Sequence, residues 1–164
     1  DPVAGLSSRG SLVTIREELD NIANYVTIQN VRYYGCIQMR YEVEDRLLDY
    51  RMPKMILQPI VENAIFHGLA ELEEDGIITI RIQSQLDEVV IEVCDNGVGM
   101  DHDTMQNLME EKSGASTGTN GIGLHNVQRR IQLHFGKPYG IQVASKIDEG
   151  TIFSILLPAI IEAK

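Results

Sequence analysis

The chain has 164 residues, a hydrophobic content of 43% and a formal net charge of -10 at pH 7. This length fits one domain over residues 1–164 with a substantial core, and no apolar run approaches the roughly 20 residues of a membrane span. We therefore expect a soluble domain. The strong negative charge excludes general affinity for nucleic acid, which needs clustered Lys and Arg side chains.

The first part of the chain predicts a helix followed by a strand. Residues 14–17 read TIRE, which is a capping box, and apolar side chains then recur at helical spacing until a plausible stop at Gly35. We expect a leader over 1–13 and a leading helix over 14–35. Residues 37–44 alternate between apolar and polar side chains, as a half-buried strand does.

A second helix is expected to open at Pro53 and to end at Gly68. After it, the runs GIITIRIQ and VVIEVCD are separated by a short polar turn and predict an antiparallel hairpin. A short helix is expected over 104–111, and Gly123 leads into the helical pattern LHNVQRRIQLHF.

Two last strands, GIQVASKI and GTIFSILLP, flank a turn at 148–150. This order of elements predicts an α+β fold, built as a two-layer α/β sandwich with a mixed, mostly antiparallel sheet covered by helices on one face. Cys36 and Cys94 lack CxxC spacing, which argues against zinc or redox chemistry, and we expect both thiols in the core.

Three segments carry candidate chemistry, and the first is LQPIVENAIFHGL at 57–69. It is apolar apart from a few side chains such as Asn63 and His67, which are four residues apart and so share one helix face. An amide oxygen is a suitable ligand for Mg²⁺. The alternative is an Asn that is hydrogen-bonded to a neighbouring loop.

The second segment is DNGVGM, at the end of the strand VVIEVCD. A carboxylate at Asp95 can accept a proton from the exocyclic amino group of adenine, whereas guanine presents a carbonyl there. Gly97 and Gly99 remove side chains where a flat base must approach the backbone. The alternative is an ordinary tight turn, because Asn and Gly cluster in turns.

The third segment is GTNGIGL at 118–124, directly before a helix. Its small residues let consecutive N–H groups point at a phosphate, and the helix N-terminus favours negative charge. The spacing is that of neither a P-loop nor a GxGxxG fingerprint. The alternative is a flexible linker.

In this order, the three segments resemble the N, G1 and G2 boxes of the GHKL (Bergerat) ATP-binding fold, which is shared by gyrase, heat-shock chaperone, histidine kinase and MutL ATPases. The resemblance covers nearly the whole chain, from TIREELDNIANYVTIQNVRY through MPKMILQPIVENAIFHGL to GTIFSILLP. The combination is similar to the catalytic domain of sensor histidine kinases of the YesM and LytS type.

The resemblance implies ATP and Mg²⁺ as cofactors and assigns roles to single residues. Asn63 would be the Mg²⁺ ligand, Asp95 would bind adenine, and His67 would lie near the phosphates or the metal. Residues 95–123 would comprise the G1 box and an ATP lid. The implied nucleotide-binding residues are Asn63, Asp95, Gly97, Gly99, Met100, Gly121, Ile122, Gly123, Leu124 and Thr151. Arg129 and Arg130 would either reach phosphate or form a solvated helix face.

Two departures from the pattern bear on the reaction. GHKL enzymes that hydrolyse ATP place a Glu base four residues before the Asn, and here that position is Pro59, which cannot move a proton. Glu62 projects about 100° away from Asn63 around a helix of 3.6 residues per turn. The histidines lie outside any acceptor hairpin; they are His67, His102, His125 and His134.

The resemblance therefore implies transfer of the ATP γ-phosphate to a histidine on a separate dimerisation domain, within a two-component system. It implies a response regulator as a further partner, a homodimeric parent, and a cytoplasmic domain of an integral membrane sensor. The start at Asp1 also indicates a fragment. The alternatives are an anti-sigma-factor serine kinase and a noncatalytic nucleotide-sensing module.

Overall fold

A computed structural model describes residues 12–32, 36–70, 75–110 and 119–161, with the backbone alone for 119–122. In chain order, its elements are β1 (Leu12–Thr14), α2 (Ile15–Arg32), β2 (Ile37–Val43), the 3₁₀ turn η1 (Asp45–Asp49), β3 (Arg51–Pro53), α3 (Leu57–Asn63), the π-helical segment η2 (Ala64–Leu69), β4 (Gly76–Gln85), β5 (Glu88–Asp95), α4 (His102–Glu110), α5 (Thr119–Phe135), β6 (Gly140–Lys146) and β7 (Gly150–Pro158).

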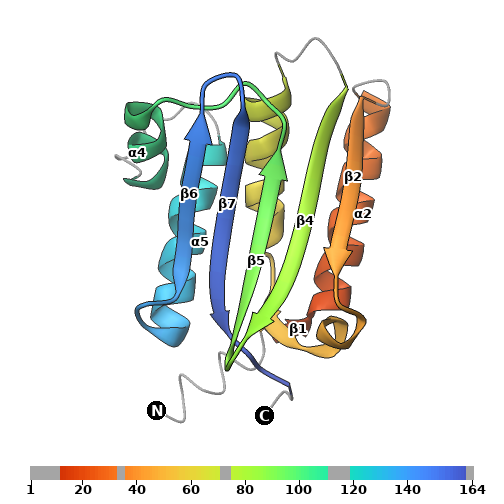
Figure 1. The fold of residues 1–164 in the computed structure, drawn as a ribbon, viewed down its shortest axis with the longest axis vertical. Helices are drawn as coiled ribbons and strands as arrows, with labels where there is room; N and C mark the ends of the chain where they lie inside the picture. Colours follow the sequence, from red (N-terminus) through yellow and green to blue (C-terminus); the bar gives the residue numbers. More distant parts are fainter. Residues whose placement is uncertain (1–11, 33–35, 71–74, 111–118, 162–164) are drawn as a thin grey trace.

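The main sheet has five strands in the order β2-β4-β5-β7-β6 (Figure 1). The β2–β4 pair is parallel, and the other neighbouring pairs are antiparallel. The expected hairpin is the β4–β5 pair, and the two last strands pair as β6–β7. The prediction of a mixed, mostly antiparallel sheet is confirmed.

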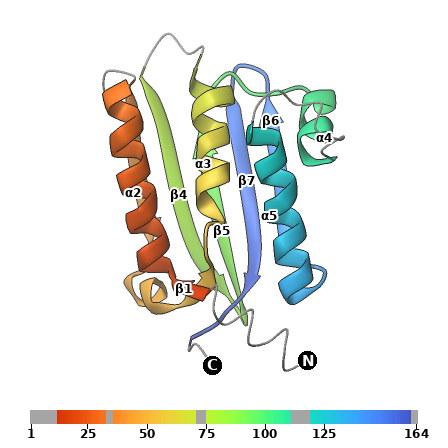
Figure 2. The same cartoon turned by 180° about the vertical axis from the view of Figure 1, so that it is seen from behind.

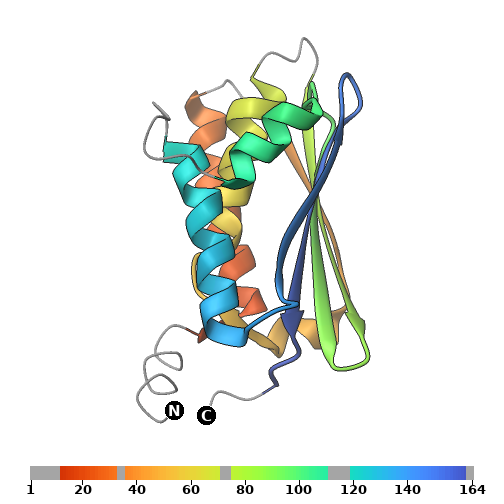
Figure 3. The same cartoon turned by 90° about the vertical axis from the view of Figure 1, so that its left-hand side faces the viewer.

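Helices α2, α3 and α5 cover one face of this sheet, with α3 between the other two (Figure 2). The side view shows the two layers, one of helices and one of strands (Figure 3). The buried apolar side chains form one cluster, to which both layers contribute. Its fully buried members include Ile22, Ile60, Ile78, Ile80, Ile91, Leu124, Ile131, Phe153 and Ile155. The two-layer α/β sandwich is therefore confirmed.

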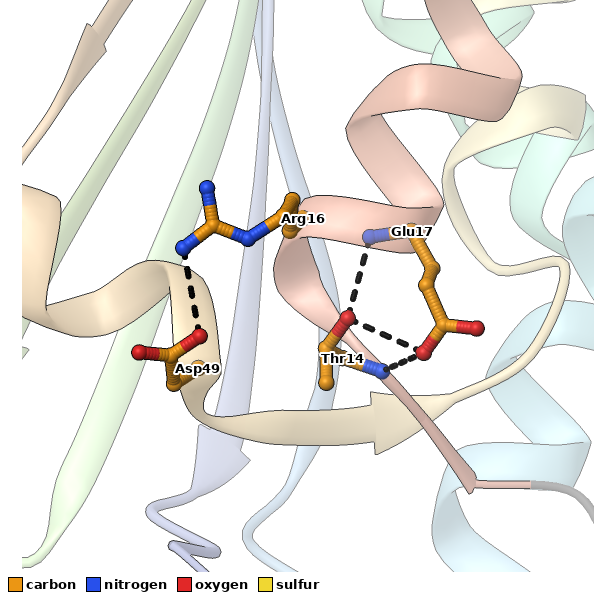
Figure 4. Close-up of polar contacts among 4 residues, drawn as sticks. All are labelled: Thr14, Arg16, Glu17 and Asp49. Carbon is orange, nitrogen blue, oxygen red and sulfur yellow. Dashed lines mark hydrogen bonds and ion pairs between the residues drawn. The ribbon is translucent and has the colours of Figure 1, made fainter.

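The capping box predicted at the start of the leading helix is present (Figure 4). The Glu17 backbone N–H donates to Thr14 Oγ1 at 3.1 Å, and the Thr14 backbone N–H donates to Glu17 Oε1 at 2.9 Å. These reciprocal bonds satisfy donors that the first helical turn leaves without intrahelical partners. The predicted end of this helix, over 33–35, and most of the leader, over 1–11, lie outside the described residues.

The predicted start of the second helix is wrong. Pro53 does not open a helix but ends the short strand β3, which pairs with β1, and α3 begins only at Leu57. Proline suits a first helical turn and also a short edge strand, so the local sequence favours neither. The predicted end at Gly68 lies within one residue of the end of η2 at Leu69.

Two further boundaries and one burial prediction differ from expectation. The short helix α4 begins at His102 instead of residue 104, and α5 begins at Thr119, before the glycines that were expected to precede it. Cys36 is exposed and Cys94 is only partly buried, because Cys36 directly precedes the edge strand β2 instead of lying within the sheet. Residues 111–118 of the predicted lid lie outside the described residues.

Candidate functional site

The candidate site is centred on Asp95, the last residue of the central strand β5. Its side chain is only 8% exposed, and its Oδ1 accepts a hydrogen bond from the Gly97 backbone N–H at 2.8 Å. A Cβ placed on Gly68 would lie 2.9 Å from this same Oδ1. The Asp95 carboxylate therefore packs directly against the helical segment that follows Asn63.

The turn after Asp95 is docked onto the end of η2 at the level of the backbone. The Val98 backbone N–H donates to the Gly68 carbonyl oxygen at 2.9 Å. A Cβ on Gly97 would overlap the Gly68 carbonyl, and a Cβ on Gly99 would overlap the carbonyl oxygen of Lys146. Gly99 also has a φ of +76°, which only glycine adopts readily. Both glycines of the DNGVGM segment are therefore required by close backbone approach.

A hydroxyl pair links the DNGVGM segment to the last two strands. Thr151 is 4% exposed and lies opposite Asp95 in the β5–β7 ladder, and its Oγ1 lies 2.7 Å from Ser145 Oγ. Ser145 Oγ also accepts a hydrogen bond from the Met100 backbone N–H at 2.8 Å. Asp95, Met100 and Thr151, which were predicted to act together, are thus held in one group.

Burial raises the pKa of Asp95 to about 6, while hydrogen bonds from the backbone N–H groups of Gly97 and Thr151 act in the opposite direction. In the part of the chain that the structure describes, Asp95 forms no ion pair. A buried carboxylate of this kind lowers the stability of the fold and is typical of a functional site.

Asn63 is the last residue of α3 and is 2% exposed. Its amide nitrogen Nδ2 is buried and has no hydrogen-bond partner among the described residues, although buried side-chain amides are usually satisfied. Among those residues, no group of three or more His, Cys, Asp or Glu side chains could hold a metal. The alternative of an Asn satisfied through this nitrogen by a neighbouring loop gains no support.

The π-helical segment η2 changes how Asn63 and Gly68 are related. In an α-helix, residues five apart point about 140° away from each other. The wider i→i+5 turns of a π-helix bring such residues closer to one face, and π-helical turns occur frequently at functional sites. The π-helical turns of η2 therefore reduce the angle around the helix axis between Asn63 and Gly68, on which the Asp95 carboxylate packs. His67 lies in the same segment, but its side chain is exposed.

The third predicted segment meets the same helix from α5. A Cβ on Gly123 would lie 3.2 Å from Cβ of Pro59 in α3, so Gly123 allows α5 and α3 to pack closely. Gly121 and Ile122 lie in the first turns of α5, where backbone N–H groups lack intrahelical partners. Leu124 is fully buried in the core. The DNGVGM and GTNGIGL segments therefore both meet the first segment, which forms α3 and η2.

Two charged residues whose roles were left open by the sequence have structural partners. Glu62 Oε2 lies 3.4 Å from the Tyr25 hydroxyl, so Glu62 is directed toward α2. Arg130 donates to the Met55 and Lys54 carbonyl oxygens, while Arg129 is exposed. The sequence also missed Gly68 and Ser145 as site residues, because each matters only through a neighbour far away in the chain.

Comparison with known proteins supports a family assignment. A family described as histidine kinase-, DNA gyrase B- and HSP90-like ATPases matches residues 48–161, well over half of the chain. The chain belongs to this ATPase family. The assignment agrees with the resemblance found in the sequence, and the family match includes the DNGVGM and GTNGIGL segments and α3.

Relatives within this ATPase family include sensor kinases. The chain is 37% identical to the sensor histidine kinase YesM of Bacillus subtilis over 90% of its own length and 24% of the relative's. It is 31% identical to the sensor protein kinase HptS of Staphylococcus aureus over 93% of its length and 29% of the relative's. The chain thus spans about a quarter of the length of these relatives.

Solved structures show the same fold at low sequence identity. The catalytic domain of the histidine kinase ThkA matches with a TM-score of 0.68 and 19% identity, covering 94% of this chain and 98% of that one. A complex of ThkA with the response regulator TrrA matches with a TM-score of 0.64 and 18% identity, covering 94% of this chain and 43% of that one.

Proposed function

We propose that this ATPase-family domain binds Mg·ATP and transfers the γ-phosphoryl group to a histidine on a separate dimerisation domain. One observation carries the proposal: the buried Asp95 carboxylate packs on Gly68, five residues after Asn63. The end of β5 and the segment from α3 to η2 can therefore together offer a carboxylate to a purine and an amide to a metal-bound triphosphate. Family membership and the kinase relatives support the same function.

In this proposal Asp95 selects the base. Its carboxylate accepts the exocyclic amino proton of adenine, and it would face a second acceptor, the carbonyl, in guanine. Gly97 and Gly99 would hold the backbone of the DNGVGM turn beside the base through their close approach to the Gly68 and Lys146 carbonyls. Met100 and Thr151 would complete the surroundings of the base. Their place around Asp95 supports these roles.

Asn63 would hold the metal. The coordinating atom would be its amide oxygen, because Nδ2 carries the amide hydrogens and cannot bind a cation. Asn63 is buried and its Nδ2 has no hydrogen-bond partner among the described residues, so no bond of that nitrogen ties the amide to another role. Mg²⁺ would supply neutralisation of the phosphate charge. The N-terminal turn of α5, with Gly121 and Ile122, would offer backbone N–H groups to the phosphates, and Gly123 would keep this turn close to α3 through its contact with Pro59.

The transfer step breaks the bond between the γ-phosphorus and the β,γ-bridging oxygen and forms a bond between phosphorus and an imidazole nitrogen. ADP leaves with the bond electrons, and the phosphorylated imidazole releases its remaining ring N–H proton to solvent. The domain contributes position and charge neutralisation. Hydrolysis of ATP by water would find no general base at residue 59, because proline has no group that can accept a proton. Pro59 instead packs against Gly123.

We further propose that the acceptor histidine belongs to the parent protein's dimerisation domain, and that the phosphoryl group then passes to a response regulator. The relatives are more than three times as long as this chain, which leaves room for such a domain and for a membrane-bound sensor part. Among the described residues, no helix is long and apolar enough to cross a membrane.

Phosphotransfer in trans tests this function. The domain is mixed with γ-labelled ATP, Mg²⁺ and a helical hairpin protein from the same parent, and acid-labile label on a histidine of the hairpin is expected. Label on serine would support the anti-sigma-factor reading instead. ATP binding without any phosphoryl transfer would support the alternative of a noncatalytic nucleotide-sensing module.

A further inference from the structure

A buried acidic residue on α2 lies outside the site described above. Glu18 is 3% exposed, whereas its neighbour Glu17 on the same helix is exposed. Within the described residues, Glu18 forms no ion pair. Its carboxylate instead accepts three hydrogen bonds from consecutive backbone N–H groups, those of Met55 at 3.1 Å, Ile56 at 2.8 Å and Leu57 at 3.0 Å.

These bonds replace a local cap at the start of α3. The N-cap position of α3 is Ile56, and its side chain makes no capping hydrogen bond; isoleucine is among the poorest residues for this position. The first N–H groups of a helix need partners from elsewhere. Glu18 supplies them from α2, so the beginning of α3 is fixed by a neighbouring helix and not by its own sequence.

The turn that Glu18 holds is unfavourable in isolation. Met55 has a φ of +62°, a left-handed conformation that a non-glycine residue adopts only where its surroundings enforce it. The Met55 backbone N–H donates to Glu18, and its carbonyl oxygen accepts from Arg130 of α5 at 3.3 Å. The turn before α3 is therefore clamped from both adjacent helices.

Polar contacts continue from Glu18 along the α2–α3 boundary. Asn21 Nδ2 donates to Gln58 Oε1 at 3.3 Å, and the Tyr25 hydroxyl donates to Glu62 Oε2 at 3.4 Å. Residues at positions i, i+3 and i+7 share one helix face, so these contacts come from a single side of α2. They reach Glu62, the residue next to Asn63.

We infer that Glu18 is a positioning residue for Asn63, through which α2 sets the geometry of the metal side of the nucleotide site. Asn63 follows Leu57 on the same short helix, so a displacement of the first turn moves its amide as well. Small displacements of a ligand group weaken binding strongly. The inference rests on the proposed function, because it takes Asn63 as the Mg²⁺ ligand.

A comparison of Glu18→Gln with Glu17→Gln tests the inference. Glutamine has the size of glutamate, but its amide nitrogen cannot accept a hydrogen bond, so at least one N–H at the start of α3 loses its partner. Titration calorimetry of the full chain measures ATP affinity with Mg²⁺ and with EDTA. We expect Glu18→Gln to reduce the gain in affinity due to Mg²⁺ by about tenfold, the size of one charge-assisted bond, and Glu17→Gln to leave it unchanged.

The same titrations on an Asn63→Ala background separate positioning from a general loss of structure. If Glu18 acts through Asn63, Glu18→Gln has no further effect on Mg²⁺-dependent affinity once Asn63 is removed. An undiminished effect in Asn63→Ala, or an equal loss with Mg²⁺ and with EDTA, overturns the inference. So does wild-type behaviour of Glu18→Gln.

Two controls complete the design. If Glu18→Gln does not fold, Glu18→Asp, which retracts the carboxylate by one methylene group, is measured in its place with the same two outcomes. If the wild-type chain itself shows no Mg²⁺-dependent ATP binding, the proposed function fails and the inference with it; wild-type binding with no effect of Glu18 variants contradicts the inference alone.

Discussion

The buried Asp95 carboxylate lowers the free energy of unfolding, and we propose that it binds the adenine base. Replacing it by Asn keeps the shape and the bond from Gly97 but removes the charge, so we expect Asp95→Asn to weaken ATP binding at least about tenfold. Calorimetric titration with ATP measures this loss. Asp87→Asn, at the exposed turn before β5, is the matched control and should bind ATP like the wild type. Equal ATP affinities of the two variants would show that Asp95 does not bind the adenine base.

The raised pKa of Asp95 also predicts how stability depends on pH. Between the ordinary value of 3.8 and about 6, the unfolded chain has lost this proton while the folded domain retains it. The unfolded state then binds fewer protons, so the contribution of Asp95 to the free energy of unfolding falls as pH rises through this window. Above pH 6 the loss levels off at up to ~3 kcal/mol.

Urea titrations from pH 4 to 7 check this prediction. Asp95→Asn lacks the titrating group. The free energy of unfolding of the variant minus that of the wild type should therefore increase as pH rises to 6 and should stay constant above pH 6. A free energy of unfolding of Asp95→Asn that falls relative to that of the wild type between pH 4 and 6 would contradict the burial of an ionised carboxylate.

Gly68 provides a test in which packing opposes helix propensity. A helical Gly→Ala change usually stabilises by about 1 kcal/mol, but at Gly68 the new Cβ would lie within 3.0 Å of the Asp95 carboxyl atoms. We therefore expect Gly68→Ala to lower both the free energy of unfolding and ATP affinity, measured by urea titration and calorimetry.

Gly136→Ala is a control that separates a general loss of stability from a specific effect on Asp95. A Cβ at Gly136 meets no atom within 4 Å, although its φ of +78° is strained for alanine. This control should lose stability and keep its ATP affinity. A more stable Gly68→Ala variant with unchanged affinity would show that Asp95 does not depend on this contact.

Among the elements, those with a strong local pattern were predicted well. The TIRE box starts α2 through bonds between residues three apart, and the alternating runs of β4 and β5 pair as expected. The start of α3 was wrong because its cap comes from Glu18, which is 37 residues before Met55 in the chain. No local pattern can reveal a partner at such a distance.

The capping box of α2 gives a prediction about stability alone. Thr14→Ala removes the hydroxyl that accepts the Glu17 backbone N–H, and loss of such a cap costs about 1 kcal/mol. Urea titration should show this decrease, and Thr14→Ser should restore most of the stability. Because the capping hydrogen bonds of Thr14 go to Glu17 and not to a residue of the candidate site, ATP affinity should stay unchanged. A large loss of affinity would contradict the separation of cap and site.

Across the whole molecule, the motifs identified the candidate residues but not their arrangement. The sequence singled out Asn63, Asp95 and Gly97 from their chemistry and their resemblance to a family. Asp95 and Gly97 both contact Gly68. These contacts arise from the packing of α3 and η2 on the sheet and join residues far apart in the chain. The same holds for Ser145, which is an unremarkable strand residue until the β6–β7 pairing brings it to Thr151 and Met100.

The central claim is that one nucleotide contacts both Asp95 and Asn63. A crystal structure of the chain with Mg²⁺ and a non-hydrolysable ATP analogue tests it most directly. The account predicts the Asp95 carboxylate within hydrogen-bond distance of the adenine amino group, and the Asn63 amide oxygen at about 2.1 Å from the metal. A nucleotide bound elsewhere, or one whose metal and phosphates lie away from Asn63, would contradict it.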